Sequence, residues 1–173
     1  MIPYGRQNID ESDIAAVLEV LQSDFLTQGP KVPEFELTVS QLCQVNYAIA
    51  VNSATSALHL ACLALGVTKG DIVWTSPISF VASANCALYC GATIDFVDVD
   101  PTTGLMSLAA LSKKLNQAAA EQKLPKVLIP VHLAGHSCDM AAIHALCQRY
   151  QIKIIEDASH AIGATYQGKP VGH

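Results

Sequence analysis

Apolar residues recur at helical spacing near the start of the chain, at Ile14, Val17, Leu18 and Leu21. This i, i+3, i+4, i+7 pattern predicts an amphipathic helix that Asp10 or Ser12 can cap. The segment Ser23–Pro30 mixes aromatic and polar residues, which is typical of a connecting loop. A second short helix follows, in which three apolar residues are predicted to face inward: Phe35, Val39 and Leu42.

From Tyr47 onward, short apolar runs alternate with helical patterns. The runs predict five strands, at Tyr47–Val51, Ile72–Trp74, Thr93–Val99, Val127–Val131 and Lys153–Glu156. Helices are predicted between them, beginning near Thr55, Ser79, Ser107 and Asp139. Short apolar strands separated by helices are typical of a parallel sheet that is covered on both faces. We therefore predict an α/β fold of three layers, α/β/α, with a mostly parallel, doubly wound sheet.

The change of pattern near residue 46 divides the chain. We predict an N-terminal helical segment at 1–45 and a partial large domain at 46–173. The ending Tyr166–His173 has the composition of a hairpin turn. We expect the fold to be incomplete where this sequence stops, with further chain and a smaller domain missing.

Composition narrows the classes of function. Of the 173 residues, 51% are hydrophobic and only 14% are charged, so we expect part of the surface to be covered in an oligomer or a longer polypeptide. The net charge of -5 argues against nucleic acid as a partner. No apolar run is long enough for a membrane span. Six cysteines lie mainly in apolar segments, and no signal peptide precedes them, so we expect reduced core cysteines and a cytoplasmic location.

A carboxylate is predicted at the end of a buried strand. Lys153–Glu156 runs directly into Asp157, at the edge where open α/β sheets bind their ligands. Because a buried carboxylate is costly unless a cation or hydrogen-bond donors meet it, we expect a partner opposite Asp157.

Two other loops at the same edge carry candidate binding groups. The turn before the helix at Thr55 offers small residues, hydroxyls and free N–H groups, which suit a phosphate, although an ordinary helix cap has the same pattern. Phe80 offers a flat apolar face, although an aromatic residue there can also belong to the core. A phosphate site, a flat face and a carboxylate together match pyridoxal 5'-phosphate.

Five segments in order resemble the motifs of the DegT/DnrJ/EryC1/StrS family of sugar aminotransferases, which have fold type I and use pyridoxal 5'-phosphate: Asn52–Leu58, Pro77–Asn85, Asp95–Asp100, Pro130–Gly135 and Glu156–Ala164. The opening Ile2–Tyr4 and the loop Asp24–Pro30 resemble members that act in pseudaminic acid biosynthesis. The resemblance covers the whole chain but only the N-terminal half of such a protein.

The resemblance implies roles for individual residues. Asp157 would pair with the pyridine nitrogen, Phe80 would stack on the ring, and His160 would lie beside it. The phosphate would be held by Ala54 and Thr55. Six positions resemble those that contact the sugar nucleotide: Tyr4, Asp24, Phe25, Leu26, Thr27 and Ala54.

The implied reaction moves an amino group from L-glutamate to C4 of a UDP-linked 4-keto-6-deoxy-N-acetylhexosamine, in an enzyme that is a homodimer. None of the eight lysines matches the family's Schiff-base lysine, which we expect beyond His173. Lys153 lies at the wrong end of its strand, and Lys169 lies in a polar turn. We therefore assign no catalytic residue to this chain and expect it to be inactive alone.

Three alternatives remain open. The chain could be a non-catalytic binding or interaction module that keeps the cofactor site without the lysine. It could hold zinc through His132, His136 and Cys138, although a convincing fourth ligand is lacking. A nucleotide-dependent Rossmann enzyme shares the fold class, but the glycine fingerprint of that class is absent.

Overall fold

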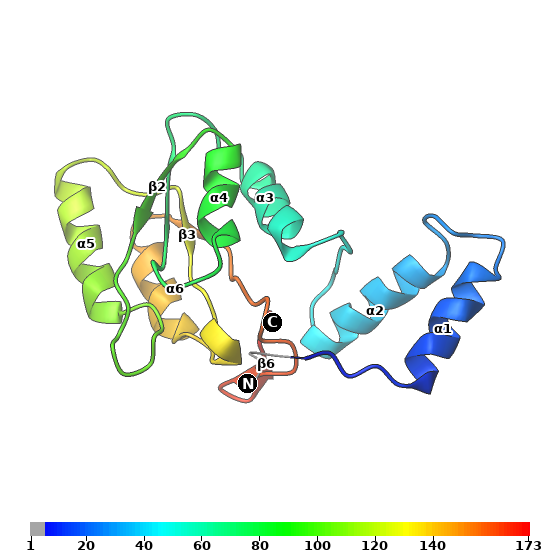
Figure 1. Cartoon of the computed structure of the whole chain (residues 1–173). Coiled ribbons are helices and arrows are strands. Elements are labelled where there is room, and N and C mark those ends of the chain that lie inside the picture. The colour runs from blue at the N-terminus through cyan, green and yellow to red at the C-terminus, as the bar shows by residue number, and fades with distance from the viewer. Residues whose placement is uncertain (1–5) are drawn as a thin grey trace. The chain divides into compact units, whose positions relative to one another are not determined.

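The computed structural model describes residues 6–173, which fall into two compact units (Figure 1). One unit contains the residues up to Gln41 together with Asn46–Ala50. The other contains Leu42–Val45 and Val51–His173. The second unit holds the sheet and both hydrophobic cores.

The first unit is built on α1 (Glu11–Leu21) and most of α2 (Lys31–Cys43). The Asp10 side chain accepts the N–H groups of Ser12 and Asp13, and Asp13 accepts the Asp10 N–H in return. This capping box satisfies donors that every helix start leaves free, and it confirms the predicted start of the first helix.

The apolar faces of these two helices are exposed. The prediction that α2 turns Phe35 and Leu42 inward is wrong, because these side chains are 59% and 50% exposed. On α1, the four apolar residues that define the helical pattern are each about half exposed or more. An apolar stripe shows which face of a helix would be buried, but burial also requires another element that packs against that face. In the described residues, neither hydrophobic core includes a side chain of α1 or α2.

The predicted strand at Tyr47–Val51 is also absent from the described structure. This segment forms no ladder, and Tyr47 and Ile49 are more than four-fifths exposed. Ala50 donates its N–H to a Glu36 side-chain oxygen at 2.8 Å. A β-type composition becomes a strand only where a neighbouring strand accepts its backbone hydrogen bonds, and no described segment does so here.

The other four strands form one parallel sheet, as predicted. They are β1 (Ile72–Thr75), β2 (Thr93–Phe96), β3 (Val127–Ile129) and β4 (Lys153–Ile154), in the order β2-β1-β3-β4. The last three are shorter than predicted, and between the extensions of β3 and β4 the pairing includes a single bridge from Val131 to Asp157. The predicted hairpin is also present, as β5 (Thr165–Tyr166) and β6 (Lys169–Pro170).

Helices cover both faces of the sheet (Figure 1). One core lies between the sheet and α3 (Ala54–Ala64) and α4 (Ala82–Tyr89), and it takes Val73, Val127 and Ile129 from the strands. The other lies against α5 (Leu108–Ala120) and α6 (Met140–Gln148), and it takes Trp74 and Leu128. Because strand side chains alternate between faces, each short apolar run supplies both cores. The three-layer arrangement is therefore confirmed.

The helices of the second unit begin close to the predicted residues, with one exception. Ser53, Ser107 and Asp139 cap α3, α5 and α6 with their side chains. The α4 helix begins at Ala82 rather than at Ser79, without a side-chain cap. All six cysteines are free, and four of them are buried. None of the helices in residues 6–173 has the length and apolar character that crossing a bilayer requires.

Candidate active site

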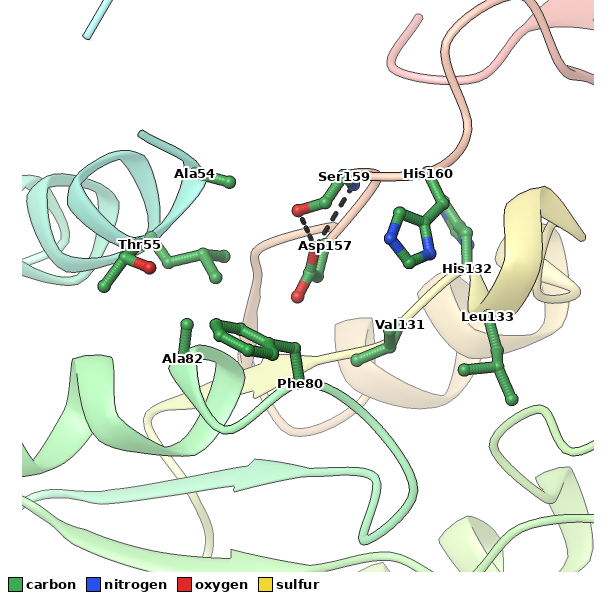
Figure 2. A pocket seen from close by; sticks show the side chains of 11 residues that line it. Ala54, Thr55, Phe80, Ala82, Val131, His132, Leu133, Asp157, Ser159 and His160 are labelled. Atoms are coloured by element: carbon green, nitrogen blue, oxygen red, sulfur yellow. Dashed lines mark hydrogen bonds between the residues drawn. The ribbon is translucent and has the colours of Figure 1, made fainter. Parts of the chain in front are cut away.

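A pocket of about 180 Å³ lies at the C-terminal edge of the sheet. Its walls come from the start of α3, the turn before α4, and the segments that follow β3 and β4 (Figure 2). All five residues that the sequence assigns to cofactor binding line it: Ala54, Thr55, Phe80, Asp157 and His160. Parallel strands bring their C-terminal ends to one edge, which explains why segments far apart in sequence meet there.

Backbone pairing fixes the position of Asp157. Its N–H donates to the Pro130 carbonyl at 2.9 Å, and its carbonyl accepts the His132 N–H at 3.0 Å. These bonds extend the pairing of β3 with β4 beyond the strands. The Asp157 residue is only 6% exposed, although its side chain reaches the pocket.

Neutral donors hold the Asp157 carboxylate. The Ser83 hydroxyl lies 2.5 Å from Oδ2. The Ser159 hydroxyl donates to Oδ1 at 2.6 Å, and the Ser159 N–H donates to the same oxygen at 3.2 Å (Figure 2). Within residues 6–173, no cation forms an ion pair with Asp157. The site therefore meets this negative charge with hydrogen bonds alone.

Sequence reasoning missed both serines. Ser159 lies two residues after Asp157, a spacing at which an Asp side chain commonly accepts a local N–H, so this contact had a recognisable signal. Ser83 lies 74 residues before Asp157 and lacks such a signal. Only the packing of α4 against the sheet brings its hydroxyl to the carboxylate.

The start of α3 presents free donors to the pocket. The Ser53 side chain accepts the Ser56 N–H at 3.2 Å and so caps the helix. The N–H groups of Ala54 and Thr55 make no hydrogen bond within the part of the chain that the structure describes. Donors of this kind at a helix start favour an anion, and the small Ala54 side chain permits close approach.

Phe80 is unusually exposed for an aromatic residue. Its side chain borders the pocket on the segment before α4 and is 73% exposed (Figure 2). An exposed aromatic face beside a cavity can stack on a planar ligand. The alternative that Phe80 belongs to the core is therefore wrong.

The backbone of His160 lies close to the backbone of Gly135. The three-residue turn η1 (Leu133–Gly135) ends at Gly135, whose φ is +84°. A Cβ atom at this position would lie 2.8 Å from the His160 carbonyl oxygen. Only glycine fits both the backbone angle and the space. This contact lets the His160 side chain line the pocket together with Leu133.

His132 is buried and hydrogen-bonded at both ring nitrogens. Nδ1 accepts the Cys138 N–H at 3.1 Å, and Nε2 lies 2.9 Å from Glu156 Oε2. A proton on Nδ1 would face the Cys138 N–H, so we assign the tautomer that carries its proton on Nε2.

These bonds also bear on the zinc alternative. Both nitrogens of His132 already have partners inside the chain, so the ring cannot ligate a metal without losing one. In the described residues, no group of three or more His, Cys, Asp or Glu side chains is arranged to hold a metal ion.

The predicted sugar-contacting loop lies elsewhere in the chain. Residues 24–27 connect α1 and α2 in the first unit, where Phe25 and Leu26 line a separate pocket of about 150 Å³. Tyr4 lies outside the described residues. Of the predicted sugar-contacting residues, Ala54 lines the sheet-edge pocket.

Comparison with protein families gives one match across nearly all of the chain. The DegT/DnrJ/EryC1/StrS aminotransferase family model matches residues 7–173. The chain is 43% identical to the UDP-4-amino-4,6-dideoxy-N-acetyl-beta-L-altrosamine transaminase of Campylobacter jejuni subsp. jejuni serotype O:23/36 (strain 81-176), over 99% of this chain and 44% of that protein. It is 39% identical to the UDP-4-amino-4-deoxy-L-arabinose--oxoglutarate aminotransferase of Shewanella sediminis (strain HAW-EB3), over 99% of this chain and 42% of that protein.

Solved structures agree with this result. Helicobacter pylori PseC, an aminotransferase involved in the biosynthesis of pseudoaminic acid, superposes with a TM-score of 0.89 at 35% identity, over 98% of this chain and 44% of that one. The PLP form of the putative sugar aminotransferase Spr1654 from Streptococcus pneumoniae also gives a TM-score of 0.89, at 32% identity, over 99% of this chain and 46% of that one. The chain thus spans less than half the length of these relatives.

Proposed function

Because the chain belongs to the DegT/DnrJ/EryC1/StrS aminotransferase family, we propose that its sheet-edge pocket binds pyridoxal 5'-phosphate as part of a sugar-nucleotide aminotransferase. The observation that carries this proposal is the Asp157 carboxylate, which is buried, borders the pocket and has no cation among the described residues. Asp157 would accept the N–H of a protonated pyridine nitrogen, which would give the buried carboxylate a positively charged partner. Such a pair stabilises the protonated ring as well as the carboxylate.

The remaining pocket residues fit the other parts of the cofactor. The free N–H groups of Ala54 and Thr55 and the Thr55 hydroxyl suit the phosphate. The exposed face of Phe80 suits the ring, and His160 would lie beside it. Bound pyridoxal 5'-phosphate would supply an electron sink for amino-group transfer. The chain's own residues bind and orient the cofactor and hold the proton on its ring nitrogen.

For the complete enzyme, we propose L-glutamate as the amino donor and a UDP-linked 4-keto-6-deoxy-N-acetylhexosamine as the acceptor. The Campylobacter jejuni relative and Helicobacter pylori PseC support this substrate class through their names. We propose that Asp24, Phe25, Leu26 and Thr27, with Tyr4 and Ala54, contact the sugar nucleotide. We propose that the product enters pseudaminic acid biosynthesis, and the printed description of Helicobacter pylori PseC supports this.

We also propose that this chain alone does not catalyse transamination. No lysine is among the described residues that line the pocket, so no amine is available there to bind the cofactor covalently or to move its protons. The same observation favours a second candidate function, a non-catalytic module that binds the cofactor. Incubation with glutamate and pyridoxal 5'-phosphate, followed by assay of 2-oxoglutarate, should give no product above the protein-free control. Steady turnover would contradict both the proposed inactivity of this chain and the non-catalytic module.

Equilibrium dialysis against pyridoxamine 5'-phosphate tests the pocket itself, since this ligand needs no covalent bond. We expect saturable binding at one site per chain. Pyridoxamine without the phosphate is the matched ligand, and it should bind more weakly because the α3 donors lose their anion. Absence of binding by the phosphorylated ligand would contradict the proposed function.

We propose that the complete enzyme is a homodimer. The exposed apolar side chains of α1 and α2 support this, since patches of this kind commonly mark an interface. Light scattering coupled to size-exclusion chromatography measures the mass directly, and a monomer at every concentration would contradict the proposal.

A further inference from the structure

The proposed function leaves open what holds Asp157 in place. Ser83 is fully buried on α4, and its hydroxyl lies 2.5 Å from Asp157 Oδ2. We propose that Ser83 is a positioning residue, which fixes the carboxylate so that its one remaining acceptor site faces the protonated ring nitrogen of the cofactor. This inference rests on the proposed function.

The Ser83 hydroxyl has one proton and two acceptors within reach. Asp157 Oδ2 lies at 2.5 Å, and the Phe80 carbonyl oxygen lies at 3.2 Å. A hydrogen bond to a charged oxygen is shorter and stronger than one to a neutral carbonyl. The Phe80 carbonyl also accepts the Ser83 N–H at 3.2 Å. The hydroxyl proton therefore goes to the carboxylate.

Counting acceptor sites shows what remains for a ligand. A carboxylate offers about four lone-pair sites, two on each oxygen. Ser159 fills both sites on Oδ1, with its hydroxyl and its N–H. Ser83 fills one site on Oδ2. One site is left, on Oδ2, and a pyridinium ring has a single N–H to fill it.

The two serines hold the carboxylate from different elements. Ser159 belongs to the same loop as Asp157, so it moves with that loop, whereas Ser83 belongs to α4. Ser83 also follows Phe80 by three residues, so one segment carries both the ring-stacking residue and the carboxylate support. Because Ser83 is fully buried, it acts on the ligand through Asp157 rather than by direct contact.

The test uses pyridoxamine 5'-phosphate labelled with ¹⁵N at the ring nitrogen, bound to the whole 173-residue chain. The ¹⁵N chemical shift reports protonation of this nitrogen, which a purely structural role of Ser83 would not alter. We expect a protonated ring with the unchanged chain at neutral pH. With Ser83→Ala, we expect a shift toward the unprotonated value and roughly fivefold to tenfold weaker binding.

Ser76→Ala is the matched control. Ser76 is also buried, at 3% exposure, but its hydroxyl has no hydrogen-bond partner among the described residues. Its loss should leave both the ¹⁵N shift and the affinity unchanged. Circular dichroism reports whether each variant is folded. If Ser83→Ala is not folded, Ser83→Cys decides, because its thiol keeps nearly the same volume but is a weaker hydrogen-bond donor, and it should move the shift in the same direction by a smaller amount.

The outcomes separate this inference from the proposed function. Binding by Ser83→Ala with unchanged affinity and ¹⁵N shift would overturn the positioning role and leave the cofactor site intact. The same result for Ser83→Cys, where that variant decides, would overturn it equally. No binding by the unchanged chain would overturn the proposed function itself, and the inference would fail with it.

Discussion

Each edge of the sheet holds a carboxylate, and the two carboxylates differ in their hydrogen-bond and ion-pair partners. At the N-terminal edge, Asp71 directly precedes β1 and pairs with Lys126, which directly precedes β3, at 2.8 Å. Asp71 also accepts the Thr68 N–H, and Lys126 donates to the Gly66 carbonyl. At the C-terminal edge, Asp157 is more deeply buried, yet among residues 6–173 its side chain has as partners only two serine hydroxyls and one serine N–H.

This difference distinguishes a carboxylate that stabilises the fold, Asp71, from a carboxylate that is available to bind a ligand, Asp157. Asp71 has its cation within the chain, so its interactions are complete. Asp157 has donors on three of its acceptor sites but no counter-charge among the described residues. Since burying a charge without a counter-charge is costly, an arrangement of this kind is typical of a functional site. The following changes test the contrast, from the largest expected effect to the smallest.

Asp157→Asn should weaken binding of pyridoxamine 5'-phosphate about 10- to 100-fold in equilibrium dialysis, because it removes a charge-assisted hydrogen bond worth roughly 1.5–3 kcal/mol. The free energy of unfolding should change by less than about 1 kcal/mol, since an amide can keep contacts with the serines and the change removes an uncompensated buried charge. Unchanged affinity, or a loss of several kcal/mol in stability, would place Asp157 with the structural charges.

Gly135→Ala should lower the free energy of unfolding in urea by about 2–3 kcal/mol. The new Cβ would need the positive φ and would lie 2.8 Å from the His160 carbonyl oxygen. Gly163→Ala is the control, because Gly163 has a φ of +81° but open space around it, and it should cost only about 1 kcal/mol. Equal effects would show that the close approach at His160 does not constrain this edge.

Phe80→Ala should weaken pyridoxamine 5'-phosphate binding about threefold to tenfold through loss of stacking. Stability should change by less than about 0.5 kcal/mol, because the side chain is 73% exposed. Phe35→Ala removes another exposed phenylalanine, on α2, and its affinity should match that of the unchanged chain. A large loss of stability with Phe80→Ala would indicate a core role instead.

Asp71→Asn should have the smallest effect, about 1 kcal/mol or less in stability at pH 7, with no change in ligand affinity. The hydrogen bond with Lys126 is the main cause that lowers the pKa of Asp71 in the folded chain below its ordinary 3.8. A lowered folded pKa contributes stability that is present above pH 3.8 and is lost as pH falls through the folded value. In urea titrations, the free energy of unfolding of Asp71→Asn should therefore be lower than that of the unchanged chain at pH 7, and the two values should converge in strong acid.

Much of the candidate site follows from local sequence. The strand before Asp157, the Ser53 cap of α3 and the turn that carries Phe80 all have patterns with a known period or cap, so their place at one sheet edge was predictable. The contacts of Ser83 and Gly135 were not predictable from local sequence. Each depends on a distant segment, and a single sequence does not indicate which segments pack together.

The errors have a common physical origin. The apolar stripe on α2 favours a packing partner, and the apolar run Tyr47–Val51 favours a neighbouring strand. The described part of the chain supplies neither. Local sequence determines what an element favours. Whether that preference is met depends on which other segments are available to pack against it.

By itself, the sequence determined the alternation of helices and strands, the parallel three-layer fold, and the delivery of Asp157 to a binding edge, because these depend on side-chain periods and caps within short segments. Only the tertiary structure decided how Asp157 is held. Its donors are Ser159 from its own loop and Ser83 from a helix 74 residues away, and the one acceptor site that they leave open is set by packing. Local sequence therefore determines that a carboxylate lies at this edge, and tertiary packing determines how the carboxylate is oriented.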